Sequence, residues 1–412
     1  MRRYLALFLS LLLSLMGCAS GEPAAEETDA IQTAAAEAVP VEAAAMEITE
    51  ESAPEELDPE VVQSIIESVA EKYGAVGIQV AVVHNGAVSG TYAYGWATID
   101  EDTMTTAHKM RVASISKVVV GIAAMLLQED GVIDLDQDIG TYWGTTVRNP
   151  AYPGVPITIR SLLNHTSSIC NYGDGYATDY ASVRSRFESG YSTALPGDIH
   201  SWEYNNYAFR VLGLTLELAA GQRIDDILQE KLFTAMQIDA AFAPGDLQDT
   251  AHLVTLYRAD GTLARSVEEQ LALHMPEQAG VDGTAFAGAF TASAEDLAKM
   301  VALLAADGIY QDMQLMTGES VALMETYIEQ PLSDGSCQAL PLVYVPQIYD
   351  REGIYYHPGC AYGVYNCISY DPLTGDGIVV LTTGAEGTAD RYDIYNVCDE
   401  INRYLYAMLA EL

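Results

Sequence analysis

A serine and a lysine three residues apart are the first candidates for chemistry. Ser114 and Lys117 lie in the stretch RVASISKVVVGIAAMLLQEDG (111–131), in which no charged residue follows Lys117 for the next eleven positions. Such an apolar run is typical of a helix that is buried on all sides. A buried ammonium group is unfavourable unless it is paired or loses its proton. Because residues three apart share one face of a helix, Lys117 is placed to activate Ser114 as a nucleophile.

A purely structural interpretation of this pair is equally open on the stretch alone. Ser114 would then cap the helix, and the head of Lys117 would reach water along its apolar stem. In the functional interpretation, the helix N-terminus at Ser114 favours developing negative charge. Burial also lowers the pKa of a lysine, which makes Lys117 a better base. Residues elsewhere in the chain must decide between the two.

Two further stretches carry residues that could complete a site. They are IHSWEYNNYAFRVLG (199–213), with Tyr204 and Asn206, and YYHPGCAYGVYN (355–366), with His357, Gly359 and Cys360. Each has an ordinary alternative: Tyr204 as a core aromatic, Asn206 as the N-cap of a helix that begins at the next residue, and His357 as a strand-edge histidine. Taken singly, these alternatives are the simpler explanation.

Taken together and in this order, the three stretches resemble the serine β-lactamase and penicillin-binding protein superfamily. The resemblance is to the branch of class C β-lactamases, D-alanyl-D-alanine carboxypeptidases and related esterases, whose motifs are S-x-x-K, Y-x-N and then K-T-G or H-x-G. Supporting blocks of similar sequence are residues 112–143, 157–168 and 287–300. The similarity runs from about residue 60 to the end of the chain.

The resemblance implies a role for each residue of the first two motifs. Ser114 would be the nucleophile that carries an acyl-enzyme, which divides a difficult hydrolysis into two easier steps. Lys117 and Tyr204 would share the general-base and general-acid work, and the sequence leaves open which of them takes the serine proton. Asn206 would hydrogen-bond the amide carbonyl of the substrate and hold Lys117 in place. No cofactor and no metal is implied.

The third motif would form the opposite wall of the site. By resemblance, the backbone N–H groups of Ser114 and of Cys360, the residue after Gly359, form the oxyanion hole. His357 would lie near the motif tyrosine and add positive potential if protonated. Pro358 is a departure, since related penicillin-recognising proteins often carry Thr or Ser there, and proline offers neither a hydroxyl nor an N–H.

We therefore expect a serine hydrolase that acts on a small molecule or peptide, such as cell-wall peptides or β-lactams. A peptidase of the D-alanyl-D-alanine carboxypeptidase type or an esterase ranks above a β-lactamase, because the third motif has the H-x-G form. The alternative from another class is a non-catalytic protein that binds cell-wall peptides. Three intact motifs argue against that alternative.

The elements that must position these residues indicate an α+β fold. Apolar spacing predicts a helix over 59–73, and the turn His84-Asn85-Gly86 between apolar runs predicts a hairpin. Strands at both chain ends predict one antiparallel sheet flanked by helices, with a mostly helical subdomain inserted from about 128 to 325. The expected C-terminal elements are strands at 342–348, 354–357, 364–370 and 378–383 and a helix from about 391 to 409.

The N-terminus predicts export. Residues 1–18 combine two arginines with a short apolar run and end in Leu15-Met16-Gly17-Cys18, which resembles the lipobox of bacterial lipoproteins. Lipidation at Cys18 would anchor the protein to the extracytoplasmic face of the cell membrane, and a plain secretory signal is the alternative. Residues 19–57, acidic and rich in alanine, are expected to form a disordered tether ahead of the hydrolase domain at 58–412.

Net charge and cysteine content limit the kinds of partner and the bonds that the protein can have. The chain has 58 acidic and 19 basic residues, a formal net charge of −39, which argues against nucleic acid and anionic membrane surfaces as partners. Five cysteines besides Cys18 do not form the pattern of a disulfide framework, and one bridge near the C-terminus or free thiols are both open. No Cys/His spacing indicates zinc.

Overall fold

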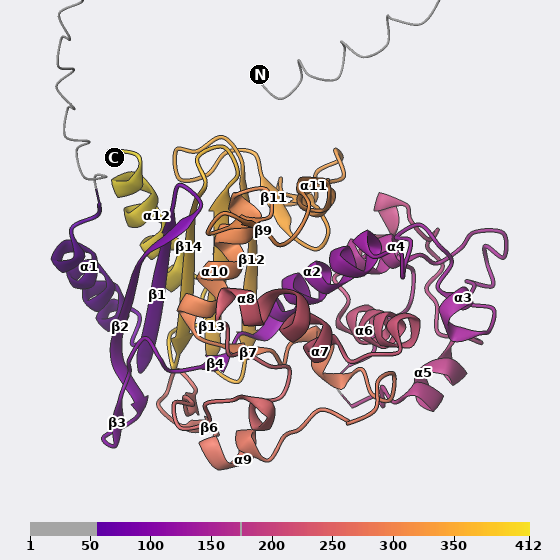
Figure 1. Cartoon of the computed structure of the whole chain (residues 1–412), viewed down its shortest axis with the longest axis horizontal. Coiled ribbons are helices and arrows are strands. Elements are labelled where there is room, and N and C mark those ends of the chain that lie inside the picture. The colour runs from indigo at the N-terminus through magenta and orange to yellow at the C-terminus, as the bar shows by residue number, and fades with distance from the viewer. Residues whose placement is uncertain (1–55, 174) are drawn as a thin grey trace, which may run out of the picture. The chain divides into compact units, whose positions relative to one another are not determined.

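An antiparallel sheet of eight strands forms the centre of the computed structural model, which describes residues 56–173 and 175–412 (Figure 1). The two chain ends meet in it, because β1 pairs with β14 from Gly77↔Thr383 to Val83↔Gly377. This confirms the predicted α+β fold with a sheet built from both termini. In sheet order the strands are β10 (Cys337–Gln338), β11 (Val343–Val345), β12 (Ile354–Ala361), β13 (Val364–Asp371), β14 (Asp376–Thr383), β1 (Gly77–His84), β2 (Ala87–Thr98) and β3 (Asp102–Thr103).

Helices cover both faces of the sheet, which explains why its central strands are almost continuously apolar. On β1, Ile78, Val80 and Val82 belong to the core shared with α1 (Pro59–Lys72) and α12 (Asn396–Leu409). The alternate residues Ala81 and Val83 belong to the larger core shared with α2 (Ser116–Glu129) and α10 (Ala294–Ala305). Strand β1 therefore contributes to two cores.

The middle of the chain supplies the mostly helical part, as predicted. Most of it lies beside the sheet on the side of α2, and the segment around residues 256–271 lies below the sheet in this view (Figure 1). Its helices are α3 (Gly140–Trp143), α4 (Ile159–Leu163), α5 (Tyr180–Arg186), α6 (Asn206–Ala220), α7 (Ile224–Leu228), α8 (Thr234–Met236), α9 (Val267–Leu271) and α11 (Gly318–Glu325). Single turns are η1 (Ala113–Ile115), η2 (Ile199–Ser201), η3 (Gln229–Phe233), η4 (Pro244–Asp246) and η5 (Thr284–Ala287). Short strand pairs are β4 (Met110–Arg111) with β7 (Thr291–Ala292), β5 (Leu256–Tyr257) with β6 (Leu263–Arg265), and β8 (Ile309–Tyr310) with β9 (Met313–Gln314).

Several boundaries differ from the predictions; the strand expected at 342–348, for example, is the shorter β11 (Val343–Val345). The last helix begins at Asn396 rather than near residue 391, because the Asp390 side chain accepts hydrogen bonds from the N–H groups of Tyr392 and Ile394 and holds a loop. Strand β12 continues to Ala361 instead of ending at His357, so the whole H-x-G motif lies in a strand.

The predictions for the N-terminus concern residues outside the described part. Cys18, the leader and nearly all of the tether at 19–57 belong there. Within residues 56–173 and 175–412, none of the helices is long and apolar enough to cross a membrane. The cysteines in these ranges, Cys170, Cys337, Cys360, Cys367 and Cys398, are free thiols.

Candidate active site

The turn that carries Ser114 leads directly into the buried helix α2. Ser114 lies in η1, and every residue of α2 from Ser116 to Leu127 is buried, as the apolar run predicts. Ala113, immediately before the serine, has φ of 52°, a left-handed conformation that costs a residue with a side chain about 1 kcal/mol. Backbone strain of this kind persists only where the surroundings hold it in place.

Lys117 lies inside the protein with its amine on the serine. Its side chain is fully buried, and Nζ donates to Ser114 Oγ at 3.2 Å and to the carbonyl oxygen of Ala287 at 2.6 Å. The same Nζ lies 4.9 Å from the ring centre of Tyr204 and 5.5 Å from that of Phe209. Hydrogen bonds and aromatic faces thus offset the cost of burying this amine.

Tyr204 reaches the serine from the loop that precedes α6. Burial raises the pKa of its phenol well above the usual value, and a hydrogen bond with Ser114 acts in the opposite direction, although 36% of the residue's surface remains exposed. The phenol is therefore protonated at neutral pH. His165 supports this loop: its ring lies 4.7 Å from that of Tyr204, and its Nδ1 accepts from the N–H of Asn205 at 3.1 Å.

Asn206 lies half-buried at the first residue of α6. The predicted alternative for this residue, a helix cap, is wrong by one position. The cap is Asn205, whose side chain accepts from the N–H of Ala208 at 2.8 Å. The roles expected of Asn206 toward substrate and Lys117 stay predictions.

Strand β12 brings the third motif against the serine turn. A side chain at Gly359 would place its Cβ 2.3 Å from the carbonyl oxygen of Val112, so the strand and the turn touch backbone to backbone. Only glycine permits this approach. The next residue, Cys360, is exposed, so its backbone lies within a strand segment that adjoins the serine turn and opens to solvent.

His357 is buried and neutral, so the condition on which it would add positive potential, a protonated imidazole, is not met at neutral pH. Only 1% of its surface is exposed, and its Nδ1 lies 2.7 Å from the carbonyl oxygen of Pro358. Burial and the nearby charge of Lys117 lower the pKa of the imidazole to about 3. Its ring centre is 6.5 Å from that of Tyr204, so it does lie at the tyrosine side of the site, as expected.

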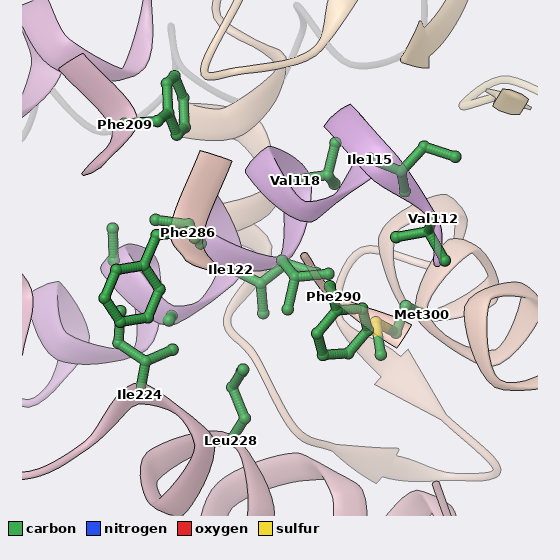
Figure 2. Packing of buried hydrophobic residues seen from close by; sticks show 14 of the residues in the cluster. Val112, Ile115, Val118, Ile122, Phe209, Ile224, Leu228, Phe286, Phe290 and Met300 are labelled. Carbon is green, nitrogen blue, oxygen red and sulfur yellow. The ribbon is translucent and has the colours of Figure 1, made fainter. Parts of the chain in front are cut away.

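One residue of the serine turn escaped the sequence analysis. Ser116 is buried, donates from Oγ to the carbonyl oxygen of Ala113 at 2.6 Å and accepts from the N–H of Phe290 at 3.0 Å. The carbonyl oxygen of Phe290 in turn accepts from the N–H of Val112 at 2.9 Å. Figure 2 shows Phe290 packed near Val112. A polar residue in an otherwise apolar helix was the signal that could have identified Ser116.

The tyrosines that follow the block at 157–168 pack a loop. Tyr172 contacts Tyr176 and Tyr207 with ring centres 4.8 and 4.9 Å apart, and the Arg186 guanidinium lies 5.0 Å from the rings of both Tyr172 and Tyr176. Tyr180 stacks on Trp143. These contacts between rings and with Arg186 account for the positions of Tyr172, Tyr176 and Tyr180 by packing.

The site thus combines a hydroxyl, an amine and a phenol in one place. Ser114, Lys117 and Tyr204 come from two helix starts, and β12 closes the opposite side with His357, Gly359 and Cys360. Such a set can support acyl transfer: the amine and phenol can exchange a proton with the serine, and backbone N–H groups can stabilise an oxyanion.

Comparisons with known proteins give this site its family context. Penicillin-binding protein 4* of Bacillus subtilis (strain 168) is 24% identical over 185 residues, which cover 42% of this chain and 39% of that protein. The chain therefore spans about two fifths of the length of that relative. Penicillin-binding protein 4 of Amycolatopsis lactamdurans is 24% identical over 302 residues, 71% of this chain and 76% of that protein.

Solved structures share the fold. The octameric penicillin-binding protein homologue from Pyrococcus abyssi has a TM-score of 0.67 at 20% identity, covering 86% of this chain and 78% of its own. A class C β-lactamase from Rhodobacter sphaeroides has a TM-score of 0.65 at 18% identity, covering 85% of this chain and 99% of its own. D-amino acid amidase from Ochrobactrum anthropi SV3 has a TM-score of 0.65 at 21% identity, covering 85% of this chain and 98% of its own. The Beta-lactamase family profile matches residues 62–399, and the chain belongs to this family.

Proposed function

We propose that this protein is a serine hydrolase that forms an acyl-enzyme on Ser114 and acts as a D-alanyl-D-alanine carboxypeptidase-like peptidase or an esterase. The observation that carries the proposal is the contact of 3.2 Å between Lys117 Nζ and Ser114 Oγ within a buried helix start. Burying a lysine amine at this position costs folding free energy, which a purely structural role does not explain. Family membership supports hydrolysis as the reaction class.

In the first step, the Lys117–Tyr204 pair reacts in the form that has one unprotonated member, which takes the proton of Ser114 while Oγ attacks the substrate carbonyl. The bond from the carbonyl carbon to the leaving nitrogen or oxygen then breaks, and the leaving group takes a proton from this pair. Tyr204 is suited to that donation, because its raised pKa keeps the phenol protonated. Water then attacks the acyl carbonyl and gives a proton to this pair, the bond from the carbonyl carbon to Ser114 Oγ breaks, and Oγ takes a proton back from the pair as the acid leaves.

The backbone N–H groups of Ser114 and Cys360 are proposed as the oxyanion hole. The approach of Gly359 to Val112 brings the strand segment before Cys360 next to the serine turn, which supports this assignment. Asn206, at the start of α6, is proposed to hold the substrate amide carbonyl. Pro358 gives the substrate no hydroxyl at the position where penicillin-recognising relatives often carry one, which disfavours carboxylate-bearing substrates, both β-lactams and D-alanyl-D-alanine ends, and keeps the esterase beside the peptidase in the proposal.

Release of D-alanine tests this function. Wild-type protein is incubated with N-acetyl-D-alanyl-D-alanine and with a D-alanyl thioester, and free D-alanine and thiol are measured. We expect release by the wild type and none by Ser114→Ala, whose fold is checked by circular dichroism. Equal release by Ser114→Ala would contradict the proposal, and so would a wild type that turns over neither substrate.

We also propose that the protein is exported and tethered to the cell membrane through a lipid on Cys18. The motif Leu15-Met16-Gly17-Cys18 supports this. Expression in a bacterial host with radiolabelled palmitate should label the wild type and leave Cys18→Ser unlabelled. Labelling of both proteins, or of neither, would contradict the proposal.

A further inference from the structure

The turn that follows α4, called the α4 turn below, includes His165 and Asn171 and binds the backbone around Tyr204. The N–H of Glu203 donates to the carbonyl oxygen of His165 at 3.0 Å, and the N–H of Asn205 donates to His165 Nδ1 at 3.1 Å. The carbonyl oxygen of Tyr204 accepts from Asn171 Nδ2 at 3.1 Å. The α4 turn therefore binds both polar atoms of the peptide group that joins Tyr204 to Asn205.

The α4 turn is itself held in place by the core and by neighbouring segments. The buried Thr166 donates its N–H to the carbonyl oxygen of Ser161 in α4 at 2.9 Å, and its carbonyl oxygen accepts from the N–H of Gly197 at 2.8 Å. Ile169 belongs to the larger core, and its carbonyl oxygen accepts from Asn205 Nδ2 at 2.6 Å. Helix α4 packs against α6, whose start adjoins the tyrosine loop (Figure 1). The turn therefore gives that loop a fixed support.

The conformation and chemistry of His165 suit it to this contact. Its φ is 62°, a left-handed conformation that histidine and asparagine adopt more readily than most residues. Its buried ring lies against those of Tyr204 and Phe209, with centres 4.7 and 5.1 Å away. Burial, together with the nearby Lys117 and His357, lowers the pKa of the imidazole well below its usual value. The ring is therefore neutral at neutral pH, and Nδ1 can accept a hydrogen bond.

The phenol of Tyr204 depends on this backbone for its position. It makes a hydrogen bond with Ser114, yet 36% of the residue's surface is exposed, so the core does not enclose it as it encloses Lys117. A proton donor must lie within hydrogen-bond reach of the leaving atom, and a shift of about 1 Å can lower a rate about 10²-fold. Fixing the backbone around Tyr204 therefore fixes the reach of its phenol.

We propose that His165 is a positioning residue for Tyr204: its carbonyl oxygen and Nδ1 hold the tyrosine backbone so that the phenol stays within reach of Ser114 and of the leaving group. Asn171 completes this support at the carbonyl oxygen of Tyr204. The inference rests on the proposed function, in which Tyr204 gives a proton to the leaving group. His165 therefore matters most for leaving groups that need a proton.

Two esters with the same acyl group separate this role from a general loss of structure. N-acetyl-D-alanine is joined to 4-nitrophenol, which leaves as an anion, and to ethanol, which must take a proton as it leaves. For both esters kcat/KM is measured, since it reports acylation. His165→Gly removes the ring without straining the left-handed backbone. It should lower kcat/KM about 10²-fold for the ethyl ester and by less than about three-fold for the nitrophenyl ester.

Three further variants complete the test. His165→Asn keeps the left-handed conformation and supplies an amide oxygen near the position of Nδ1, so it should recover most of the rate for the ethyl ester. Gln237→Gly is the matched control, because Gln237 is exposed, has φ of 54° and lies outside the site, and both rates should stay unchanged. If circular dichroism shows that His165→Gly does not fold, the exposed Asn171→Ala should show the same preference, at about ten-fold for the ethyl ester.

A double-mutant cycle with Tyr204→Phe tests whether His165 acts through the tyrosine. If it does, His165→Gly should slow the ethyl ester little further once the phenol is absent. Equal slowing of both esters by His165→Gly, fully additive effects with Tyr204→Phe, or a His165→Asn protein as slow as His165→Gly would each overturn the inference. The proposed function fails separately, when the wild type hydrolyses neither ester or Ser114→Ala hydrolyses the ethyl ester equally fast, and the inference then falls with it.

Discussion

The two walls of the site are built in different ways. In the serine wall, Ser116 and Lys117 are fully buried, and the strained residue Ala113 is held through Ser116. In the wall formed by β12, His357 and Gly359 are buried against the serine turn, whereas Cys360 is exposed and Tyr362, at the turn that follows, keeps 41% of its surface in solvent. The serine wall is held in place by the core, whereas the β12 wall opens to water at Cys360 and Tyr362.

This difference separates chemistry from selectivity. Groups that transfer protons need fixed distances, and burial with several hydrogen bonds supplies them. Groups that choose among substrates can vary on an exposed surface with little effect on the fold. We therefore expect substitutions in the serine wall to lower the rate for every substrate, and those at the turn to change the preference among substrates.

The largest effect is expected at Lys117. Replacement by methionine keeps the buried stem but removes the amine that lies 3.2 Å from Ser114 Oγ. The rate of acylation should fall by about 10²–10⁴-fold, the contribution typical of a positioned acid or base. Stopped-flow acylation with a chromogenic ester measures it, and thermal unfolding shows whether the variant folds. A folded Lys117→Met protein with near-wild-type acylation would show that Lys117 takes no part in proton transfer.

Gly359→Ala should break the contact between the two walls. Its Cβ would lie 2.3 Å from the carbonyl oxygen of Val112, so the strand or the serine turn must move. A shift of this size can cost about 10²-fold in rate. Gly154→Ala is the matched control, because a Cβ there has no atom within 4 Å. Similar kcat/KM values for both variants would show that the close approach is unimportant.

Acid should destabilise the fold through His357. Its pKa is about 3 in the folded protein and near 6.5 when unfolded, so below pH 6.5 the unfolded chain binds more protons. Stability is lost as pH falls from 6.5 toward 3, by about 2 kcal/mol at pH 5 from this residue. His165, whose pKa burial also lowers well below the usual value, adds to the same trend.

Urea unfolding at pH 7 and pH 5 measures this loss. His357→Gln should lose less stability than the wild type over this range. An identical loss in His357→Gln and wild type would contradict a neutral buried imidazole.

The smallest of these effects is expected at Ser116, and it tests whether hydrogen bonds within the serine wall set the rate. Ser116→Ala removes both hydrogen bonds that tie Ala113 to Phe290 and leaves the buried N–H of Phe290 without a partner, while the carbonyl oxygen of Ala113 still accepts from the backbone N–H of residue 116. We expect about ten-fold slower acylation with unchanged KM, and a loss of about 1–3 kcal/mol in stability. Ser116→Thr keeps the hydroxyl and should recover most of the rate. If threonine recovered stability but not rate, Ser116 would have only a structural role.

Much of the architecture could be predicted from local patterns. Helix α1 begins at Pro59 as expected, and the hairpin at Asn85-Gly86 joins β1 to β2. The order of the three motifs identified the residues that β12 and the two helix starts bring together. These features depend on neighbouring residues or on sequence similarity, so a single sequence displays them.

The remaining features depend on contacts between distant segments. The clash that demands glycine at Gly359 involves Val112, and the Ser116 bridge involves Phe290. The neutral state of His357 follows from its burial beside Lys117. Asn205 and Asn206 are identical neighbours, so only the backbone could show which one caps α6. None of these relations leaves a local pattern in the sequence.

Ser114 is the nucleophile of the proposed mechanism, and trapping its acyl-enzyme tests that role most directly. Residues 58–412 are mixed with a labelled penicillin, intact mass is measured, and any adduct is located by peptide mapping, with Ser114→Ala alongside. We predict one adduct per chain on the peptide that contains Ser114, and none on the variant. An adduct on another residue, or equal labelling of Ser114→Ala, would contradict the account.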